Sequence, residues 1–171
     1  MELNKSLPNQ LKLFNFAKKE ISFSGIYQVS DLPKISEIAR NKKDNVKVDL
    51  SFYLENDKTP CIDGIIQLDI ILACQRCLDD LSIALEVNFS LAFIKHNQES
   101  EGLESHFEVY VIKEEELATH DLISDEILLS IPMVPTHDYD CIKEINEQEI
   151  VEGKSENPFA ILRKIADGGK E

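Results

Sequence analysis

The stretch S-I-A-L-E-V-N-F-S-L-A-F-I, residues 82–94, carries the clearest structural pattern in the chain. Small or polar residues alternate in it with large apolar ones. The large apolar residues occupy every second position: Ile83, Leu85, Val87, Phe89, Leu91 and Phe93. A two-residue period is typical of a β-strand with one buried face and one wetter face. We therefore predict a strand over residues 82–94.

Three other stretches resemble this one. Residues 46–54 alternate in the same way, and residues 62–72 place Asp63, Gln67 and Asp69 on one side. Residues 107–112 form a shorter apolar run. Consecutive strands that are buried on one face only favour antiparallel pairing. We predict an α+β fold: an antiparallel β-sheet, open or barrel-like, with short helices at its flanks.

Three segments carry helix signals. One helix is expected to begin at Asp31, with Asp31 as N-cap and Ile35 and Ile38 facing the core. A second is expected over residues 121–130, with Ile123, Ile127 and Ile131 on one face and Pro132 as its stop. A third is expected over residues 155–165, in which Asn157 precedes a proline suited to the first helical position.

The chain is predicted to be a single domain over residues 1–171. Its length is sufficient for one domain with a substantial core. Two acidic loops, at residues 96–106 and 138–156, have no apolar period and are expected to be mobile. The sequence has neither a secretory signal nor an apolar run near the ~18 residues of a membrane span. We expect a cytoplasmic protein whose cysteines (Cys61, Cys74, Cys77 and Cys141) are reduced or metal-bound.

The net charge of −14 is unevenly distributed. Residues 1–47 carry nine basic and five acidic residues, or +4, and residues 48–171 carry nine and 27, or −18. An acidic body repels nucleic acid at long range and attracts basic partners such as ribosomal proteins. The basic first quarter is the candidate for contact with a phosphate backbone. Alternatively, its lysines are ordinary solvated surface residues.

The four residues Cys74 to Cys77 form a C-x-x-C between two predicted strands, at or near a hairpin turn. A zinc site needs four ligands, and His137 with Cys141 is the only comparable second pair. A redox pair is the second alternative, but it requires a strand-to-helix junction that this context does not provide. The third is that Cys74 and Cys77 are small, half-buried turn residues.

No enzymatic constellation is visible. The sequence contains no phosphate-cradling glycine loop and no G-x-S-x-G. His96, His106 and His120 have no orienting nucleophile nearby in sequence and are expected at the surface. We therefore predict a protein that is not an enzyme and has no small-molecule substrate.

Several stretches together resemble the YceD family of bacteria and plastids. The match is carried by C-Q-R-C-L at 74–78 with the strand that follows, and by F-S-G-I-Y at 23–27. It continues in D-E-I-L-L-S-I-P-M-V-P-T-H-D at 125–138 and N-P-F-A-I-L at 157–162. These stretches span nearly the whole chain.

The resemblance implies a non-enzymatic factor in ribosome biogenesis that supports accumulation or processing of the 23S rRNA of the large subunit. Cys74, Arg76 and Cys77 fit the family's C-x-R-C, and Pro132, Pro135 and His137 fit its P-x-V-P-x-H. Some relatives carry a second cysteine pair after the prolines. This chain departs from them by offering His137 and Cys141 instead.

The leading interpretation is a binding factor for 23S rRNA or a precursor particle of the large subunit. Arg76 at the hairpin tip is one RNA-contact candidate, because its planar guanidinium can bond two phosphate oxygens. The others are the basic residues Lys18, Lys19, Arg40, Lys42 and Lys43. The alternative is an acidic adaptor that engages basic ribosomal or RNA-processing proteins without contacting RNA. In that case the apolar segment 159–165 could dock in a partner's groove as a short helix.

Overall fold

A five-stranded sheet is the centre of the computed structural model, which describes residues 6–95 and 106–142. The strands are β2 (Ser22–Gln28), β3 (Asn45–Glu55), β4 (Thr59–Ala73), β5 (Asp80–Lys95) and β6 (Glu108–Ile112), adjacent in that order. All four predicted strands are therefore confirmed. The sheet is open, with β2 and β6 at its two edges, so the barrel-like alternative is wrong.

Strand direction differs from the prediction at one place. The pairs β2–β3, β3–β4 and β4–β5 are antiparallel, but β6 runs parallel to β5, with Leu91 opposite Glu108. Residues 96–107 separate the two strands, and about a dozen residues suffice for the crossover that a parallel pair needs. The two-residue period reports which face of a strand is buried and does not report its direction.

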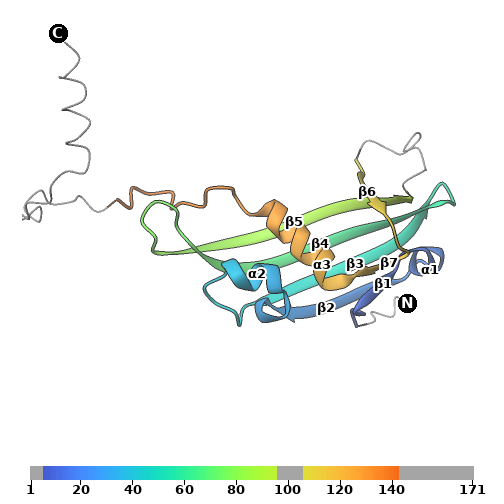
Figure 1. Ribbon diagram of the computed structural model, residues 1–171, viewed down its shortest axis with the longest axis horizontal. Helices are drawn as coiled ribbons and strands as arrows, with labels where there is room; N and C mark the ends of the chain where they lie inside the picture. Colours follow the sequence, from blue (N-terminus) through green and yellow to red (C-terminus); the bar gives the residue numbers. More distant parts are fainter. Residues whose placement is uncertain (1–5, 96–105, 143–171) are drawn as a thin grey trace, which may run out of the picture. The chain divides into compact units, whose positions relative to one another are not determined.

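The two faces of the sheet differ in character. Val48, Ile66 and Val87 lie side by side on the inner face and are buried. Lys47 and Gln67 lie beside Glu86 on the outer face, and all three are exposed. Figure 1 shows helices α2 (Pro33–Ile38) and α3 (Thr119–Ser130) across the inner face. The core thus lies between the sheet and these helices.

One close approach within the sheet involves a glycine. Gly64 on β4 lies opposite Phe89 on β5, whose ring covers it. A Cβ at position 64 would lie 2.0 Å from the ring atom Cζ of Phe89. Only glycine leaves room for the ring at this position.

The helices follow the predictions with two differences. In α3, Ile123 and Ile127 are buried and Ile131 packs against the core from the residue after the helix, as predicted. Ile35 of α2 is also buried, but Ile38 is 42% exposed because α2 has too few turns to keep both side chains inside. Asp31 does not cap α2. It ends a short 3-10 helix, η1 (Val29–Asp31), and accepts a 2.8 Å hydrogen bond from the Gln28 backbone.

A second, two-stranded sheet joins distant parts of the chain. Strand β1 (Gln10–Lys12) pairs antiparallel with β7 (Glu116–Ala118), and helix α1 (Leu13–Lys18) follows β1. The Thr119 backbone N–H donates to the Asn9 carbonyl at 3.1 Å. This pairing holds the beginning of the chain beside the start of α3.

The domain prediction is tested only in part of the chain. Residues 1–141 form one compact unit. The predicted helix at 155–165 and most of the two acidic loops lie outside the described residues, so these predictions stand as they were made. No helix in the described ranges is long and apolar enough to cross a membrane.

Candidate metal centre

The C-x-x-C lies in the turn between β4 and β5, residues 74–79, which we call the knuckle. The Cys74 N–H donates to the Asp79 carbonyl at 2.9 Å, and the Leu78 N–H donates to the Cys74 carbonyl at 2.9 Å. Leu78 has a φ of 65°, a left-handed conformation that turns the chain back toward β5. Strand β5 follows directly, so no helix begins after the two cysteines. The redox alternative therefore lacks the helix N-terminus it requires.

The second pair of predicted ligands lies in residues 132–142, which we call the arm. The arm begins at Pro132, after α3 has ended at Ser130. It passes the knuckle at Pro135, a buried residue whose carbonyl accepts a 2.8 Å hydrogen bond from the Gln75 N–H. This contact places His137 and Cys141 beside Cys74 and Cys77, although about 60 residues separate the two pairs in sequence.

The four side chains meet at one point. One ligand atom from each of Cys74, Cys77, His137 and Cys141 lies within 4.8 Å of the other three. The Cys74 and Cys141 sulfurs are 3.8 Å apart, and the Cys77 sulfur is 3.5 Å from Nδ1 of His137. Around tetrahedral zinc, ordinary bond lengths separate two sulfurs by about 3.8 Å and a sulfur from a nitrogen by about 3.6 Å. Both distances fit a zinc ion.

The orientation of His137 also suits a ligand. Its Nε2 lies 3.1 Å from the Asp80 carbonyl oxygen, which can only accept a hydrogen bond. The ring proton therefore belongs on Nε2, and the Nδ1 lone pair faces the cysteines. A carbonyl that holds the far nitrogen of a ligating histidine is a common arrangement in metal sites.

Backbone donors around the knuckle separate the cysteine pKa values. Although burial would raise it, hydrogen bonds from the backbones of Cys77, Arg76 and His137 lower the pKa of Cys74 to about 5. A backbone hydrogen bond from Asp79 favours the Cys77 thiolate. Desolvation and the neighbouring Cys141 and Cys74 sulfurs outweigh it and raise the pKa of Cys77 to about 11. Such crowded sulfurs compete to ionise, and a divalent cation would remove the conflict.

Arg76, predicted as an RNA contact, is hydrogen-bonded to the arm. Its Nε donates to the Cys141 sulfur at 3.1 Å, and a terminal nitrogen donates to the His137 carbonyl at 2.8 Å and to the Tyr139 carbonyl. Burial acts against the Cys141 thiolate, but the hydrogen bond from Arg76 outweighs it and lowers the pKa of Cys141. The alternative partner suggested by the sequence, Asp80, pairs with Arg40 instead. Sequence reasoning missed that Arg76 binds one of the ligands themselves.

Arg40 lies at the knuckle as well. Its Nε is 3.3 Å from an Asp80 carboxylate oxygen, and a terminal nitrogen donates to the Leu78 carbonyl at 2.8 Å. Lys42 and Lys43 follow in the loop before β3, and both are exposed. The structure thus brings three of the predicted basic residues to the end of the sheet that carries the metal ligands.

Lys18 and Lys19 lie elsewhere. They end α1 just before β2, whose Ser22 pairs with Ser51, which in turn pairs with Asp63 on β4. Cys74 is eleven residues further along β4 and its turn, about 35 Å at the rise of a strand. These two lysines therefore cannot act at the same point as Arg40, Lys42 and Lys43.

The ligand set is closed: four protein side chains, with Cys74 buried and the other three half-buried. A metal with four protein ligands has no open position for water or substrate, which is typical of a structural site. The sequence pattern that could have revealed the remaining contacts is weak, because the hydrogen bonds to His137 and from Gln75 use backbone atoms.

Comparisons with known proteins agree with this pattern of residues. The family model described as large ribosomal RNA subunit accumulation protein YceD matches residues 62–166, which include all four ligands. A protein of Haemophilus influenzae with the same description is 30% identical over 169 residues, which covers 93% of this chain and 95% of that protein. No solved structure matches. The chain therefore belongs to the YceD family.

Proposed function

We propose that this protein supports the accumulation of large-subunit ribosomal RNA by binding 23S rRNA or a precursor particle, without catalysing a reaction. The observation that carries the proposal is the Cys74–Cys77–His137–Cys141 cluster beside an exposed basic loop, in a chain that belongs to the YceD family. The proposed site is the knuckle end of the sheet, and the expected location is the cytoplasm.

The first part of the proposal is that the four ligands hold one zinc ion. Zinc would act there as a cross-link between the knuckle and the arm. Cys74, Cys77 and Cys141 would bind through sulfur and His137 through Nδ1. The guanidinium of Arg76 would balance the excess negative charge of three thiolates.

The second part is that Lys42 and Lys43 contact phosphate. Their side chains are exposed, whereas Asp80 already partly neutralises Arg40, and Arg76 directs donors to the arm. A lysine ammonium is a compact charge suited to non-specific phosphate contact. Zinc would fix the knuckle beside this loop, because Arg40 connects the loop to the Leu78 carbonyl.

The metal is tested by elemental analysis of the purified protein. We expect one zinc per chain in the parent and less than a tenth of that in Cys141→Ser. Cys61→Ala is the matched control, because Cys61 lies in a separate apolar cluster with Ala92 and Phe107. Full zinc content in Cys141→Ser would show that the four-ligand site does not form.

The RNA contact is tested by Lys42→Glu/Lys43→Glu. We expect weaker binding to large-subunit rRNA, a flatter salt dependence by about one unit of log–log slope for each phosphate lost, and less mature rRNA in cells. Lys58→Glu/Lys113→Glu makes the same charge change at two exposed lysines away from the knuckle and should bind as the parent does. Equal binding by both double variants would exclude the knuckle loop as the contact.

The adaptor function is the second candidate. It is favoured by the exposed outer face of the sheet, where Asp49, Asp63, Asp69 and Glu86 accompany a single lysine, Lys47, on β3–β5. Pull-downs with and without nuclease separate the two functions. Ribosomal proteins that remain bound after nuclease treatment would favour the adaptor, and their loss would favour RNA.

A further inference from the structure

Strand β5 is paired along only part of one side. Toward β4 it is paired from Asp80 to Ala92, but toward β6 it is paired only from Leu91 to Lys95. Residues 81–90, which we call the open edge, have no strand beside them among the described residues. Figure 1 shows β5 bordering the sheet from the knuckle as far as β6. The open edge is about 33 Å long at the rise of a strand.

The unpaired backbone groups of the open edge can be assigned. The Asp80 carbonyl accepts from His137, so it points away from β4. Main-chain groups alternate along a strand, and the next residues that point the same way are Ser82, Ala84, Glu86, Asn88 and Ser90. Each offers one N–H and one C=O to an additional strand. Such an edge is a template for strand addition unless the protein blocks it.

The usual blocking devices are absent from these ten residues. They contain no proline, no lysine and no arginine, and β5 has no bulge in its register with β4 across them. Edge strands that must stay free typically carry such features. The open edge is therefore a regular, unprotected strand.

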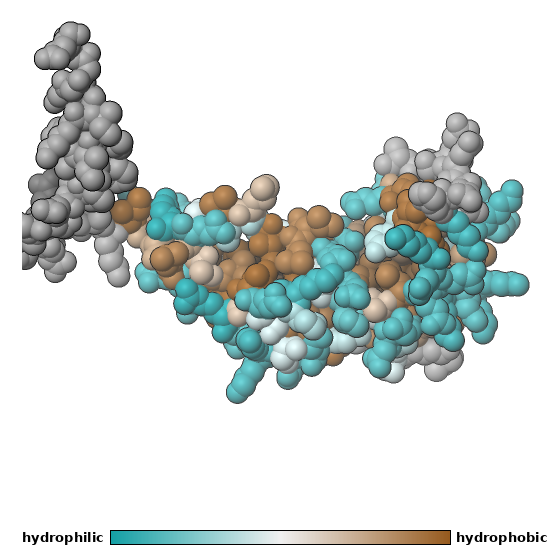
Figure 2. Space-filling model, viewed as in Figure 1, coloured by the Kyte–Doolittle hydropathy of each residue, from teal (hydrophilic) through white to brown (hydrophobic). Residues whose placement is uncertain are grey.

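The inner side of the open edge is apolar. Leu81, Ile83 and Leu85 are only half-buried there, unlike Val87 and Phe89 further along the same strand. Across from them, α3 exposes Leu128 and Leu129, the latter to 76%. Figure 2 shows apolar surface gathered over this part of the molecule. An added strand would cover these side chains with its own apolar residues.

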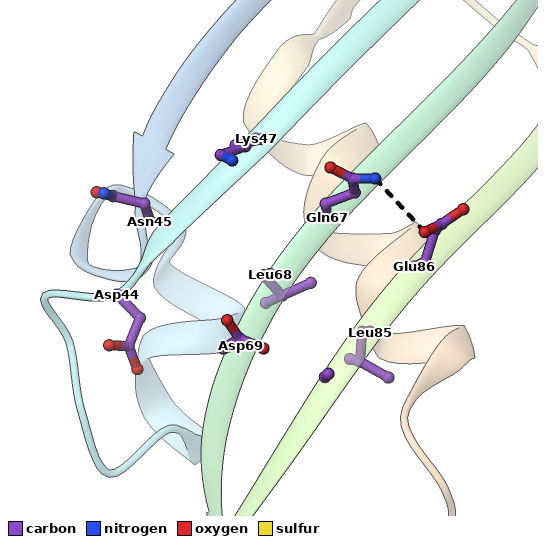
Figure 3. A pocket seen from close by; sticks show the side chains of 9 residues that line it. Asp44, Asn45, Lys47, Gln67, Leu68, Asp69, Leu85 and Glu86 are labelled. Atoms are coloured by element: carbon purple, nitrogen blue, oxygen red, sulfur yellow. Dashed lines mark hydrogen bonds between the residues drawn. The ribbon is translucent and has the colours of Figure 1, made fainter.

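The outer side of the open edge is acidic. Residues 77–94 contain Asp79, Asp80 and Glu86 and no basic residue. Glu86 lies in a depression of about 500 Å³ on the outer face, with Asp44 and Asp69 also in its lining and Lys47 as its single basic residue (Figure 3). In Figure 3 the carboxylate of Glu86 accepts only a 3.4 Å hydrogen bond from Gln67. Basic side chains would complement this surface.

We propose that the open edge of β5 binds an extended segment of a basic protein, which pairs with residues 81–90 as an additional strand. Apolar side chains of the segment lie against Leu81, Ile83 and Leu85, and lysine or arginine side chains alternate with them on the acidic outer face. A second copy of this chain fits less well, because it would oppose acidic side chains to acidic side chains in a protein of net charge −14. The site is separate from the RNA contact of Lys42 and Lys43 and does not depend on it.

The test uses the full chain and a fluorescent eleven-residue peptide in which lysine alternates with valine or threonine. Fluorescence anisotropy measures binding, and amide hydrogen exchange by NMR locates it. We expect saturable binding that slows exchange at Ser82, Ala84, Glu86, Asn88 and Ser90. Glu86→Lys should weaken binding by about tenfold or more, because it replaces an attraction with a repulsion. Glu37→Lys, the same change on the exposed surface of α2, should leave it unchanged.

Two N-methylated peptides test the backbone pairing directly. One carries N-methyl groups on its lysine amides and the other on its valine and threonine amides. Strand addition requires that one of them loses binding, since alternate amides face β5. If both bind as tightly as the parent peptide, the proposal is overturned.

Other occupants would give distinct results that also overturn the proposal. Slow exchange at these five amides in the free monomer would assign the edge to another segment of this chain, and the same protection in a dimer would assign it to a second copy. Protection by an rRNA fragment that competes with the peptide would assign it to nucleic acid. Lys42→Glu/Lys43→Glu should bind the peptide as the parent does, so failure of the RNA proposal is recognised separately.

Discussion

Arg76 is the side chain that connects the knuckle to the arm most directly. Its guanidinium uses two nitrogens to reach the Cys141 sulfur and the carbonyls of His137 and Tyr139. A lysine at this position would carry the same charge but could not span three acceptors with a planar group. Geometry as well as charge should therefore decide how firmly the arm is held.

The first prediction concerns the loss of this connection. Arg76→Ala should release zinc to a chromogenic chelator about 10–100-fold faster than the parent, the usual effect of removing a residue that supports metal ligands. Arg76→Lys should fall between the two, because it keeps the charge and loses the fork. If Arg76→Ala releases zinc at the parental rate, the guanidinium does not support the site.

A second prediction concerns the contact between Gly64 and Phe89. Gly64→Ala places a Cβ 2.0 Å from the Phe89 ring, so the ring or the strand must shift. We expect the free energy of unfolding to fall by about 2 kcal/mol in urea titrations. In a Phe89→Leu background the same substitution should cost clearly less, which a double-mutant cycle measures. Strictly additive effects would show that the two residues do not interact.

Among the elements, α3 contains a buried carboxyl group that titrates unusually. Glu126 is 7% exposed between α3 and the strands. Burial, reinforced by the charges of Glu108 and Asp125, raises the pKa of Glu126 from 4.5 to about 7. The folded state therefore keeps a proton on this group at pH values where the unfolded chain has lost it. The charged form opposes folding.

The third prediction follows from the sign of this shift. Between about pH 4.5 and 7 the folded state binds more protons, so Glu126 lowers stability as pH rises, with the full cost present above pH 7. That cost should be about 1–2 kcal/mol, allowing for partial access of water to the carboxyl group. Glu126→Gln should make the unfolding free energy flatter with pH in this window than in the parent. Parallel curves for the two proteins would contradict the assignment.

The elements also show what the sequence could predict. Strands β3, β4 and β5 are long enough to display several alternations, so their existence and buried faces were predictable. Strands β1 and β7 have three residues each, too few for a period, and only their pairing makes them strands. Ile38 fits a helical period but is exposed, because the period ignores where α2 ends.

The candidate site divides in the same way. The spacing of Cys74 with Cys77 and of His137 with Cys141 identified two ligand pairs. Their meeting depends on the Gln75–Pro135 backbone contact and on the path of the arm, which no local pattern encodes. The position of Arg76 at the hairpin tip was predictable, but its partners were not, since two of them are backbone carbonyls.

For the molecule as a whole, the metal site lies at one end of a large core. The main apolar cluster runs from Leu11 to Ile127 through all five strands of the main sheet except β6, which contributes only Ile112, and Cys74 is not part of it. Removal of zinc should therefore loosen the knuckle and the arm without unfolding the sheet. The arm would lose its strongest attachment and keep the Gln75–Pro135 contact.

The fourth prediction is a measurement of this difference. Chelation should lower the melting temperature by several degrees while the far-ultraviolet circular dichroism of the sheet remains. Amide exchange should speed up in the knuckle and the arm and stay slow in β3 and β4. Complete unfolding on chelation would show instead that the metal is required for the whole fold.

The sequence separation of the two ligand pairs has a consequence during protein synthesis. A ribosome that adds about 5–20 residues per second makes Cys74 and Cys77 roughly 3–12 seconds before His137 and Cys141. Strands β2 to β5 are complete in the nascent chain during that interval, with two uncapped thiols at the tip of a finished hairpin. A growing chain in zinc-poor cells would thus present a half-built site to oxidants first, and damage should concentrate at these two thiols on arrested chains.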